Sequence, residues 1–133
     1  MNLNDLKESI ESSILALATS TPDGRPNCIA VACCKVISDN QVLISDNFFN
    51  KTRQNLLINS QVSVAFWDPE DNPAGNRGYQ LKGVAQYLTQ GKWKQIVDAD
   101  PDNEGLAHKA AVLVTVTEIW DLANPKLLFK QEV

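Results

Sequence analysis

The residues best suited to chemistry stand together at the start of one predicted helix. Lys51, Thr52 and Arg53 follow Asn50 directly, and no carboxylate lies among them although the chain as a whole is acidic. Asn50 is a favourable N-cap, because its side chain can accept from the unpaired amides of the first turn. Unpaired amides, the positive end of the helix dipole, a hydroxyl group and two cations can together bind a phosphate group. The residues alone equally allow a solvated first turn in which Lys51 and Arg53 contact only water.

Other residues that often carry chemistry are few. The single histidine, His108, lies in a segment rich in Ala and Leu, which favours a structural or surface role over metal binding or catalysis. Cys28, Cys33 and Cys34 are odd in number and clustered, which favours buried free thiols over a disulfide framework or a zinc site. Neither a Gly-rich phosphate loop nor a Gly-x-Ser-x-Gly motif occurs in the sequence. The sequence therefore predicts no catalytic residue and no metal ligand.

Length and composition indicate one domain, residues 1–133, with enough chain for a hydrophobic core. The net charge of −4 argues against general nucleic-acid binding, which needs a basic face to neutralise phosphates. No apolar run approaches the roughly 20 residues of a membrane-spanning helix, and the first residues do not resemble a secretion signal. We therefore expect a cytoplasmic protein that binds neither nucleic acid nor membranes.

Hydrophobic periodicity predicts mainly β structure with a few short helices. Leu3, Leu6 and Ile10 recur at helical spacing and predict an amphipathic N-terminal helix. Apolar alternation predicts six strands, at residues 13–20, 27–38, 41–45, 61–67, 78–89 and 111–120. The first three are expected to form an antiparallel meander. Six short strands with short helices predict a small barrel or a strongly curved sheet.

Three further features of the chain carry expectations about packing. A helix at residues 51–59 is expected to turn its apolar side chains, Leu57 and Ile58 among them, toward the core. Residues 68–77 contain two prolines and a glycine and are expected to form a loop. Gly83 is expected to mark a β-bulge or a close approach of two backbones, because it interrupts a strand pattern.

Four segments of the sequence resemble a known family. They read ALATSTPDGRPN, VLISDNFFNKTRQNL, VSVAFWD and GYQLKGVAQYL in chain order. In this order they resemble the FMN-binding split-barrel superfamily, which includes the pyridoxamine 5′-phosphate oxidases and small FMN-binding proteins. The resemblance covers residues 15–89. It implies a six-stranded antiparallel split β-barrel with an N-terminal helix and short crossing helices. It also implies a homodimer that holds FMN in a groove between its subunits.

The resemblance also implies which residues hold the cofactor. Lys51 and Thr52 match the basic and hydroxyl ligands of the FMN phosphate, and Trp67 is a weaker candidate for a wall near the flavin ring. Ser45 and Asp46, with Asn47 next to them, match the strand-end positions that contact phosphate and ribityl. Four residues match the strand along which the isoalloxazine ring lies: Asn27, Ile29, Ala30 and Val31. Asn55 is expected to support the site from the same face of the helix as Lys51.

The resemblance is incomplete at the C-terminal end. The arginine and histidine groups that hold pyridoxal phosphate in the oxidases have no counterpart here, so we do not expect vitamin B6 oxidation. We predict an FMN-binding flavoprotein that acts in electron transfer with an unidentified redox partner, or as a flavin-dependent oxidoreductase. Two alternatives stay open: a non-enzymatic module of the same fold that binds haem, F420 or another nucleotide cofactor, and an interaction surface that has lost its ligand.

Overall fold

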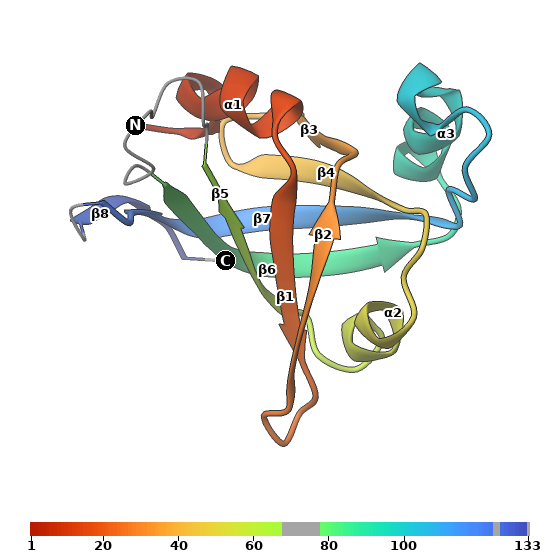
Figure 1. The fold of residues 1–133 in the computed structure, drawn as a ribbon, viewed down its shortest axis with the longest axis horizontal. Coiled ribbons are helices and arrows are strands. Elements are labelled where there is room, and N and C mark those ends of the chain that lie inside the picture. The colour runs from red at the N-terminus through yellow and green to blue at the C-terminus, as the bar shows by residue number, and fades with distance from the viewer. Residues whose placement is uncertain (68–77, 124–125, 133) are drawn as a thin grey trace.

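The computed structural model describes residues 1–67, 78–123 and 126–132, so the expected loop at residues 68–77 lies outside the described residues. Eight strands form one antiparallel, strongly curled sheet, and short helices lie around it (Figure 1). The strands are β1 Leu15–Ser20, β2 Pro26–Val31, β3 Cys34–Val36, β4 Gln41–Asp46, β5 Gln61–Phe66, β6 Tyr79–Leu88, β7 Ala110–Asp121 and β8 Lys126–Lys130.

The strand order is β2-β1-β5-β6-β7-β4-β3, and β8 pairs with β7 outside this path. The two ends of the path, β2 and β3, are joined in the chain by only Ala32 and Cys33. The three Cα–Cα steps from Val31 to Cys34 can span no more than about 11 Å. The sheet must therefore curl until its two end strands nearly meet, which produces a barrel that is split between β2 and β3. The predicted split barrel is confirmed.

The predicted number of strands is wrong, because the structure has eight rather than six. The single strand expected at residues 27–38 is divided into β2 and β3, so the expected three-strand meander does not form. Instead β2 pairs with β1, and β3 pairs with β4. The tail of the chain supplies β8, whose register against β7 includes Ile119 opposite Phe129.

The core fills the concave side of the curled sheet. On β7, the longest strand, Val112, Val114 and Val116 are buried, as their alternation predicts. Close backbone contact between β6 and β7 occurs at Gly83, where the register shifts by a bulge. A Cβ atom there would lie 2.4 Å from the carbonyl oxygen of Thr115, so the expectation of a close approach is confirmed.

The N-terminal helix is a 3-10 turn, η1 Leu3–Leu6, followed by α1 Lys7–Ser12. Its predicted apolar face is confirmed, because Leu3, Leu6 and Ile10 are all buried. The helix is attached to the edge of the sheet by Glu11, whose Oε2 accepts a hydrogen bond of 2.9 Å from the backbone N–H of Val36. The N-terminal helix therefore covers one end of the barrel beside β3.

The second helix, α2 Lys51–Leu56, packs against β1, β2 and β6 and is shorter than expected. Leu57 and Ile58 lie beyond its last turn and are 63% and 64% exposed, so the prediction that they enter the core is wrong. The chain must turn there to enter β5, and this turn directs both side chains outward. Asn50 does precede the helix, but its side chain makes no capping hydrogen bond with the first turn.

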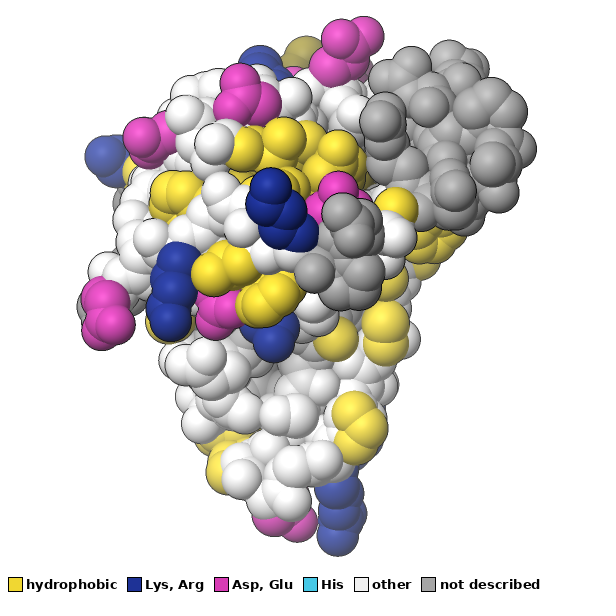
Figure 2. Space-filling view, turned by 90° about the vertical axis from the view of Figure 1, so that its left-hand side faces the viewer, with side chains coloured by type: hydrophobic (Ala, Val, Ile, Leu, Met, Phe, Trp, Pro, Cys, Tyr) yellow, Lys and Arg dark blue, Asp and Glu magenta, His cyan; other side chains and the backbone are white. Residues whose placement is uncertain are grey.

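A third helix, α3 Lys92–Ala99, and the 3-10 turn η2 Pro101–Asn103 lie at the other end of the barrel from β8 (Figure 1). Viewed from the β8 side, hydrophobic side chains are mixed with charged ones, and the β1–β2 hairpin narrows to a charged tip (Figure 2). At that tip Arg25 Nε lies 3.7 Å from Asp23 Oδ2. No helix in the described part of the chain is long and apolar enough to cross a membrane.

Candidate functional site

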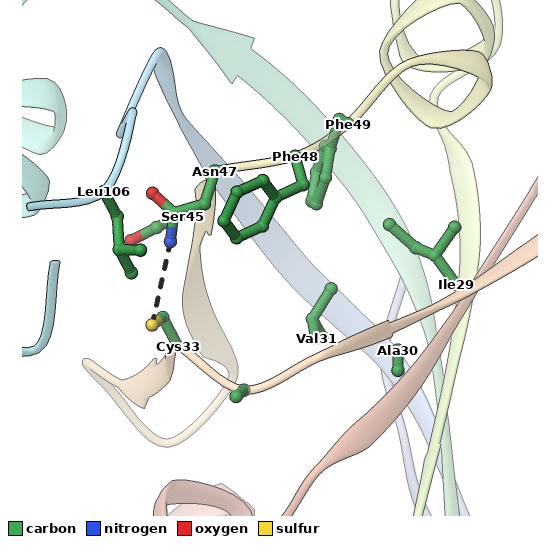
Figure 3. A pocket seen from close by; sticks show the side chains of 10 residues that line it. Ile29, Ala30, Val31, Cys33, Ser45, Asn47, Phe48, Phe49 and Leu106 are labelled. Carbon is green, nitrogen blue, oxygen red and sulfur yellow. Dashed lines mark hydrogen bonds between the residues drawn. The ribbon is translucent and has the colours of Figure 1, made fainter.

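A pocket of about 440 Å³ lies where the barrel is split (Figure 3). Its walls come from β2 and the link to β3, from the end of β4 and the corner after it, and from the segment before β7. The residues that line it are Ile29, Ala30, Val31, Ala32, Cys33, Ser45, Asn47, Phe48, Phe49 and Leu106. Its size falls within the range of pockets that bind small molecules and cofactors.

The pocket has an apolar wall and one polar end. Ile29 and Val31 of β2 face Phe49, which is buried, while Phe48 at the mouth is 81% exposed (Figure 3). The polar groups gather on the side away from α2, around Ser45 and Asn47 (Figure 3). A flat apolar molecule with polar groups at its ends would match this distribution.

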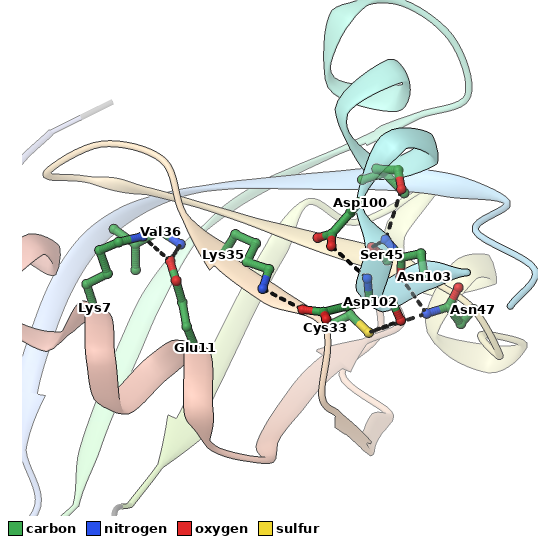
Figure 4. A network of polar contacts seen from close by, with 11 residues as sticks. Lys7, Glu11, Cys33, Lys35, Val36, Ser45, Asn47, Asp100, Asp102 and Asn103 are labelled. Carbon is green, nitrogen blue, oxygen red and sulfur yellow. Dashed lines mark hydrogen bonds and ion pairs between the residues drawn. The ribbon is translucent and has the colours of Figure 1, made fainter. Parts of the chain in front are cut away.

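Residues 100–109 build the polar end from outside (Figure 4). Asn103 is 1% exposed, and its Nδ2 donates to Ser45 Oγ at 2.8 Å, while its Oδ1 accepts from Asn47 Nδ2 at 3.1 Å. Asn47 Oδ1 accepts from the backbone N–H of His108 at 2.8 Å. An ion pair of 2.7 Å between Lys35 on β3 and Asp102 ties the same segment to the edge of the sheet.

Asp46 shapes the corner that follows β4. It is completely buried, its Oδ1 accepts from the backbone N–H of Phe49 at 2.9 Å, and its Oδ2 accepts from the hydroxyl of Tyr87. Burial, together with this carboxylate, raises the pKa of Tyr87 to about 12. Both oxygens of Asp46 are therefore occupied within the protein.

The start of α2 adjoins the other end of the pocket wall. Thr52 is buried, and its Oγ1 accepts a hydrogen bond of 3.0 Å from Asn27 Nδ2 on β2. Lys51 is exposed beside it. Asn55 is buried one turn further along and donates from Nδ2 to Thr19 Oγ1 at 3.0 Å. Asn27 stands two residues before Ile29 on the same face of β2, so the helix start is continuous with the apolar wall.

The structure thus divides the expected cofactor-binding residues into three groups. Five of them line the pocket: Ile29, Ala30, Val31, Ser45 and Asn47. Asn27, Lys51 and Thr52 meet at the start of α2, and Asp46 and Asn55 are buried in supporting hydrogen bonds. That these residues bind a cofactor stays a prediction.

The weaker candidate, Trp67, lies elsewhere. It borders a second hollow, of about 410 Å³, on the outer face of β2, together with Ile14, Cys28 and Ala30. The side chain of Trp67 is therefore separated from the first pocket by β2 itself. Trp67 and Ile14 are 53% and 66% exposed, which leaves an apolar surface beside the edge strand.

The pocket holds little acid–base chemistry. Among the described residues that line it, Cys33 is the one titratable group, and burial, with the nearby carboxylates of Asp102 and Asp100, raises the pKa of this thiol. His108 lies outside the lining, with its Nδ1 2.7 Å from Asp98 Oδ1. Within the described residues no three His, Cys, Asp or Glu side chains converge as a metal site would require. The pocket is suited to holding a molecule, with little means to move protons in it.

Three parts of the site were missed from the sequence. Asn103, Leu106 and the Phe48–Phe49 pair are not among the residues that the sequence predicts for the site. All three cysteines were expected to be buried, but only Cys34 is buried: Cys28 is exposed and Cys33 is partly exposed. An apolar residue such as Leu106 within a polar turn is a weak sequence signal for burial against another element.

Comparison with known proteins identifies the family. Residues 4–123 match the family model described as pyridoxamine 5′-phosphate oxidase. An uncharacterized protein of Methanocaldococcus jannaschii is 35% identical over 139 residues, which cover 96% of this chain and 88% of that protein. The chain therefore belongs to the pyridoxamine 5′-phosphate oxidase-like family of the FMN-binding split-barrel superfamily.

Solved structures share the fold. HupZ of Group A Streptococcus has a TM-score of 0.80 at 24% identity, covering 96% of this chain and 98% of that one. An FMN-binding protein of Syntrophomonas wolfei has a TM-score of 0.69 at 16% identity, covering 90% and 87%. HutZ, the heme storage protein of Vibrio cholerae, has a TM-score of 0.66 at 19% identity, covering 91% and 95%. An F420 reductase is also similar, with a TM-score of 0.60 at 20% identity, covering 84% and 93%. At these identities the likeness establishes the fold alone.

Proposed function

We propose that this protein is an FMN-binding flavoprotein that acts in electron transfer or as a flavin-dependent oxidoreductase. The observation that carries the proposal is the continuity of the pocket with the start of α2. An apolar wall from Ile29 to Val31 leads to a helix start that carries the exposed Lys51, the buried Thr52 and no carboxylate. FMN needs this combination, because it joins a flat aromatic ring to a phosphate group.

The residues present fit such a molecule. The pocket volume of about 440 Å³ accommodates a ring system between β2 and the Phe48–Phe49 corner. Lys51 is exposed, and within the described part of the chain no ion pair occupies its ammonium group, which leaves it available for a phosphate. Membership of the FMN-binding superfamily supports the same assignment.

When bound, the flavin would supply the redox chemistry, and the protein would hold it and adjust its potential. Of the chain's own residues, Val31, Phe49 and Leu106 line the pocket and would shield a bound ring from water. The raised pKa of Cys33 keeps its thiol protonated at neutral pH, so it adds no negative charge beside the ring. We therefore assign the chain binding and orientation and assign no catalytic side chain.

A second candidate function is haem or F420 binding in the same pocket. Its support is the shared fold of HutZ, described as a heme storage protein, and of an F420 reductase. F420 also carries phosphate, so the same helix start would serve it. Titration with haem would separate the first alternative, because bound haem gives an intense visible absorption that flavin does not.

We also propose that the protein is a homodimer with the pocket beside the subunit boundary. Strand β2 lies at the edge of the sheet, so one side of its backbone is unpaired. Its outer face carries the exposed Cys28 and Ala30 and adjoins Ile14 and Trp67. An exposed apolar surface along an open strand edge is typical of a protein–protein contact. A second copy covering this surface would bring its own residues close to the pocket wall.

Replacing the phosphate-binding residues tests the assignment of the cofactor. Lys51→Ala and Thr52→Val should each weaken FMN binding about tenfold or more, because each loses a hydrogen bond to a charged group worth about 1.5–3 kcal/mol. Riboflavin, which lacks the phosphate, should bind both variants as it binds the original protein. Flavin fluorescence titration measures both ligands.

Two variants serve as controls for that titration. Thr52→Ser keeps the hydroxyl group that accepts from Asn27 and should retain FMN affinity. Lys126→Ala removes an exposed cation on β8 and should leave binding unchanged. Unchanged FMN affinity in both Lys51→Ala and Thr52→Val would refute the phosphate assignment.

A further inference from the structure

Both amide hydrogens of Asn103 and its Oδ1 are engaged in hydrogen bonds near the pocket (Figure 4). Its Nδ2 donates one hydrogen to Ser45 Oγ at 2.8 Å and the other to the backbone carbonyl of Val97 at 2.9 Å. Its Oδ1 accepts from Asn47 Nδ2 at 3.1 Å. Asn103 lies in η2, whereas Ser45 and Asn47 lie on and after β4. One buried amide therefore links the end of the barrel that carries α3 and η2 to the pocket wall.

Two backbone groups fix which way these amides point. The carbonyl oxygen of Val97 can only accept, so the atom of Asn103 that faces it must be Nδ2. The N–H of His108 can only donate, so the atom of Asn47 that faces it must be Oδ1. The contact between the two amides is favourable in this orientation, and flipping either amide would create two unfavourable contacts. Hydrogen-bond direction is thus set by the backbone through both side chains.

The consequence falls on Ser45. Its Oγ accepts a hydrogen bond from Asn103 Nδ2, because an amide nitrogen can only donate and cannot accept the hydrogen of the Ser45 hydroxyl. The hydroxyl of Ser45 still has one hydrogen of its own, and no acceptor for it is found among the described residues. Ser45 also lines the pocket. Its hydroxyl hydrogen is therefore available to a molecule in the pocket.

We propose that Asn103 is a positioning residue that makes Ser45 a hydrogen-bond donor toward the bound ligand, so that the pocket selects a ligand with an unprotonated oxygen or nitrogen at this end. The proposal rests on the function proposed above. The acceptor is an atom of the flavin ring, because Ser45 lies on the side of the pocket away from α2, where the phosphate is expected (Figure 3). A ligand that offers only a donor at this place would meet the hydroxyl hydrogen and bind less well.

A double-mutant cycle tests this role by FMN titration of the original protein and of Ser45→Ala, Asn103→Ala and the double variant. Ser45→Ala should weaken FMN binding by about 3- to 10-fold, the effect of one lost neutral hydrogen bond. Asn103→Ala should weaken binding when Ser45 is present and have no further effect once Ser45 is Ala. A purely structural Asn103 would instead weaken binding by the same factor in both backgrounds, which would overturn the proposal.

Riboflavin identifies the acceptor in the same experiment. Ser45→Ala should weaken riboflavin and FMN equally, because the acceptor belongs to the ring that both share, and a loss for FMN alone would contradict the proposal. No effect of Ser45→Ala on either flavin contradicts the proposal even if Asn103→Ala fails to fold. If the original protein binds FMN and the cycle is additive, the inference fails and the proposed function stands. If the original protein does not bind FMN, the proposed function fails, and this inference fails with it.

Discussion

At the scale of single residues, Asp46 illustrates how buried polar groups shape the pocket without lining it. Its two carboxylate oxygens hold the backbone of Phe49 and the hydroxyl of Tyr87. The first of these bonds closes the corner after β4 and directs Phe49 inward and Phe48 outward. An aromatic residue is thereby placed at the mouth of the pocket by a side chain that is itself completely buried.

Cys34 gives a prediction at the same scale. Burial, aided by the nearby Glu11, raises the pKa of its thiol from 9.0 to about 12. The folded protein keeps this proton while the unfolded chain releases it above pH 9, so the contribution to stability is complete below pH 9 and is lost as the pH rises toward 12. Between pH 8 and pH 10 the free energy of unfolding should fall by about 1.4 kcal/mol from this group.

Urea unfolding of the original protein and of Cys34→Ala at both pH values measures this loss. The variant should lose about 1.4 kcal/mol less than the original protein over the same pH interval. Tyr87 titrates in both proteins, so its contribution cancels in the comparison. Equal losses in the two proteins would show that Cys34 is not protected in the folded state.

The candidate phosphate site at the start of α2 was predictable because its residues are neighbours in the chain. Lys51, Thr52 and the preceding Asn50 are consecutive, and a helix start follows from neighbouring residues alone. Asn103 was not predictable, because its role depends on hydrogen bonds to Ser45 and Val97, the first of which spans 58 positions in the chain. Nothing in the composition of the turn around Asn103 indicates that it is buried.

At the scale of elements, the division between β2 and β3 is the feature that sequence periodicity could not provide. Residues 27–38 are uniformly rich in Ile, Val, Ala and Cys, so they read as one strand. The division is imposed by pairing, since β2 binds β1 and β3 binds β4 at the opposite end of the sheet. The link that results, Ala32–Cys33, forms part of the pocket wall. The pocket is therefore a direct product of the split in the barrel.

The bulge at Gly83 gives a prediction for the pairing of β6 with β7. Gly83→Ala would place a Cβ atom 2.4 Å from the backbone oxygen of Thr115, which has no room to move within the sheet. We expect a loss of about 1–3 kcal/mol in the free energy of unfolding, the usual cost of overpacking. Urea denaturation monitored by circular dichroism measures it.

The matched control for this change lies on the same strand. Gln86 is exposed on β6, so Gln86→Ala should change the free energy of unfolding by less than about 0.5 kcal/mol. If Gly83→Ala were as stable as Gln86→Ala, the close approach of β6 and β7 would be wrong.

At the scale of the whole molecule, fold class was predictable because each strand carries its own alternation of apolar and polar residues. Val62, Val64 and Phe66 on β5 are buried as this alternation requires. The family resemblance covered residues 15–89 and located the helix start. The pocket itself needed residues 100–109, which lie outside that region and reach the site only through folding. Leu106 and Asn103 complete the cavity from there.

The central claim, that the pocket holds FMN beside a subunit boundary, is tested most directly by sedimentation velocity of the protein mixed with FMN and observed through the visible absorption of the flavin. We predict a coloured boundary whose sedimentation coefficient corresponds to a particle of twice the chain mass of 14.7 kDa. A coloured boundary that corresponds to a single chain would contradict the proposed dimer but would still support flavin binding in the pocket. Flavin that fails to sediment with the protein would contradict the central claim itself.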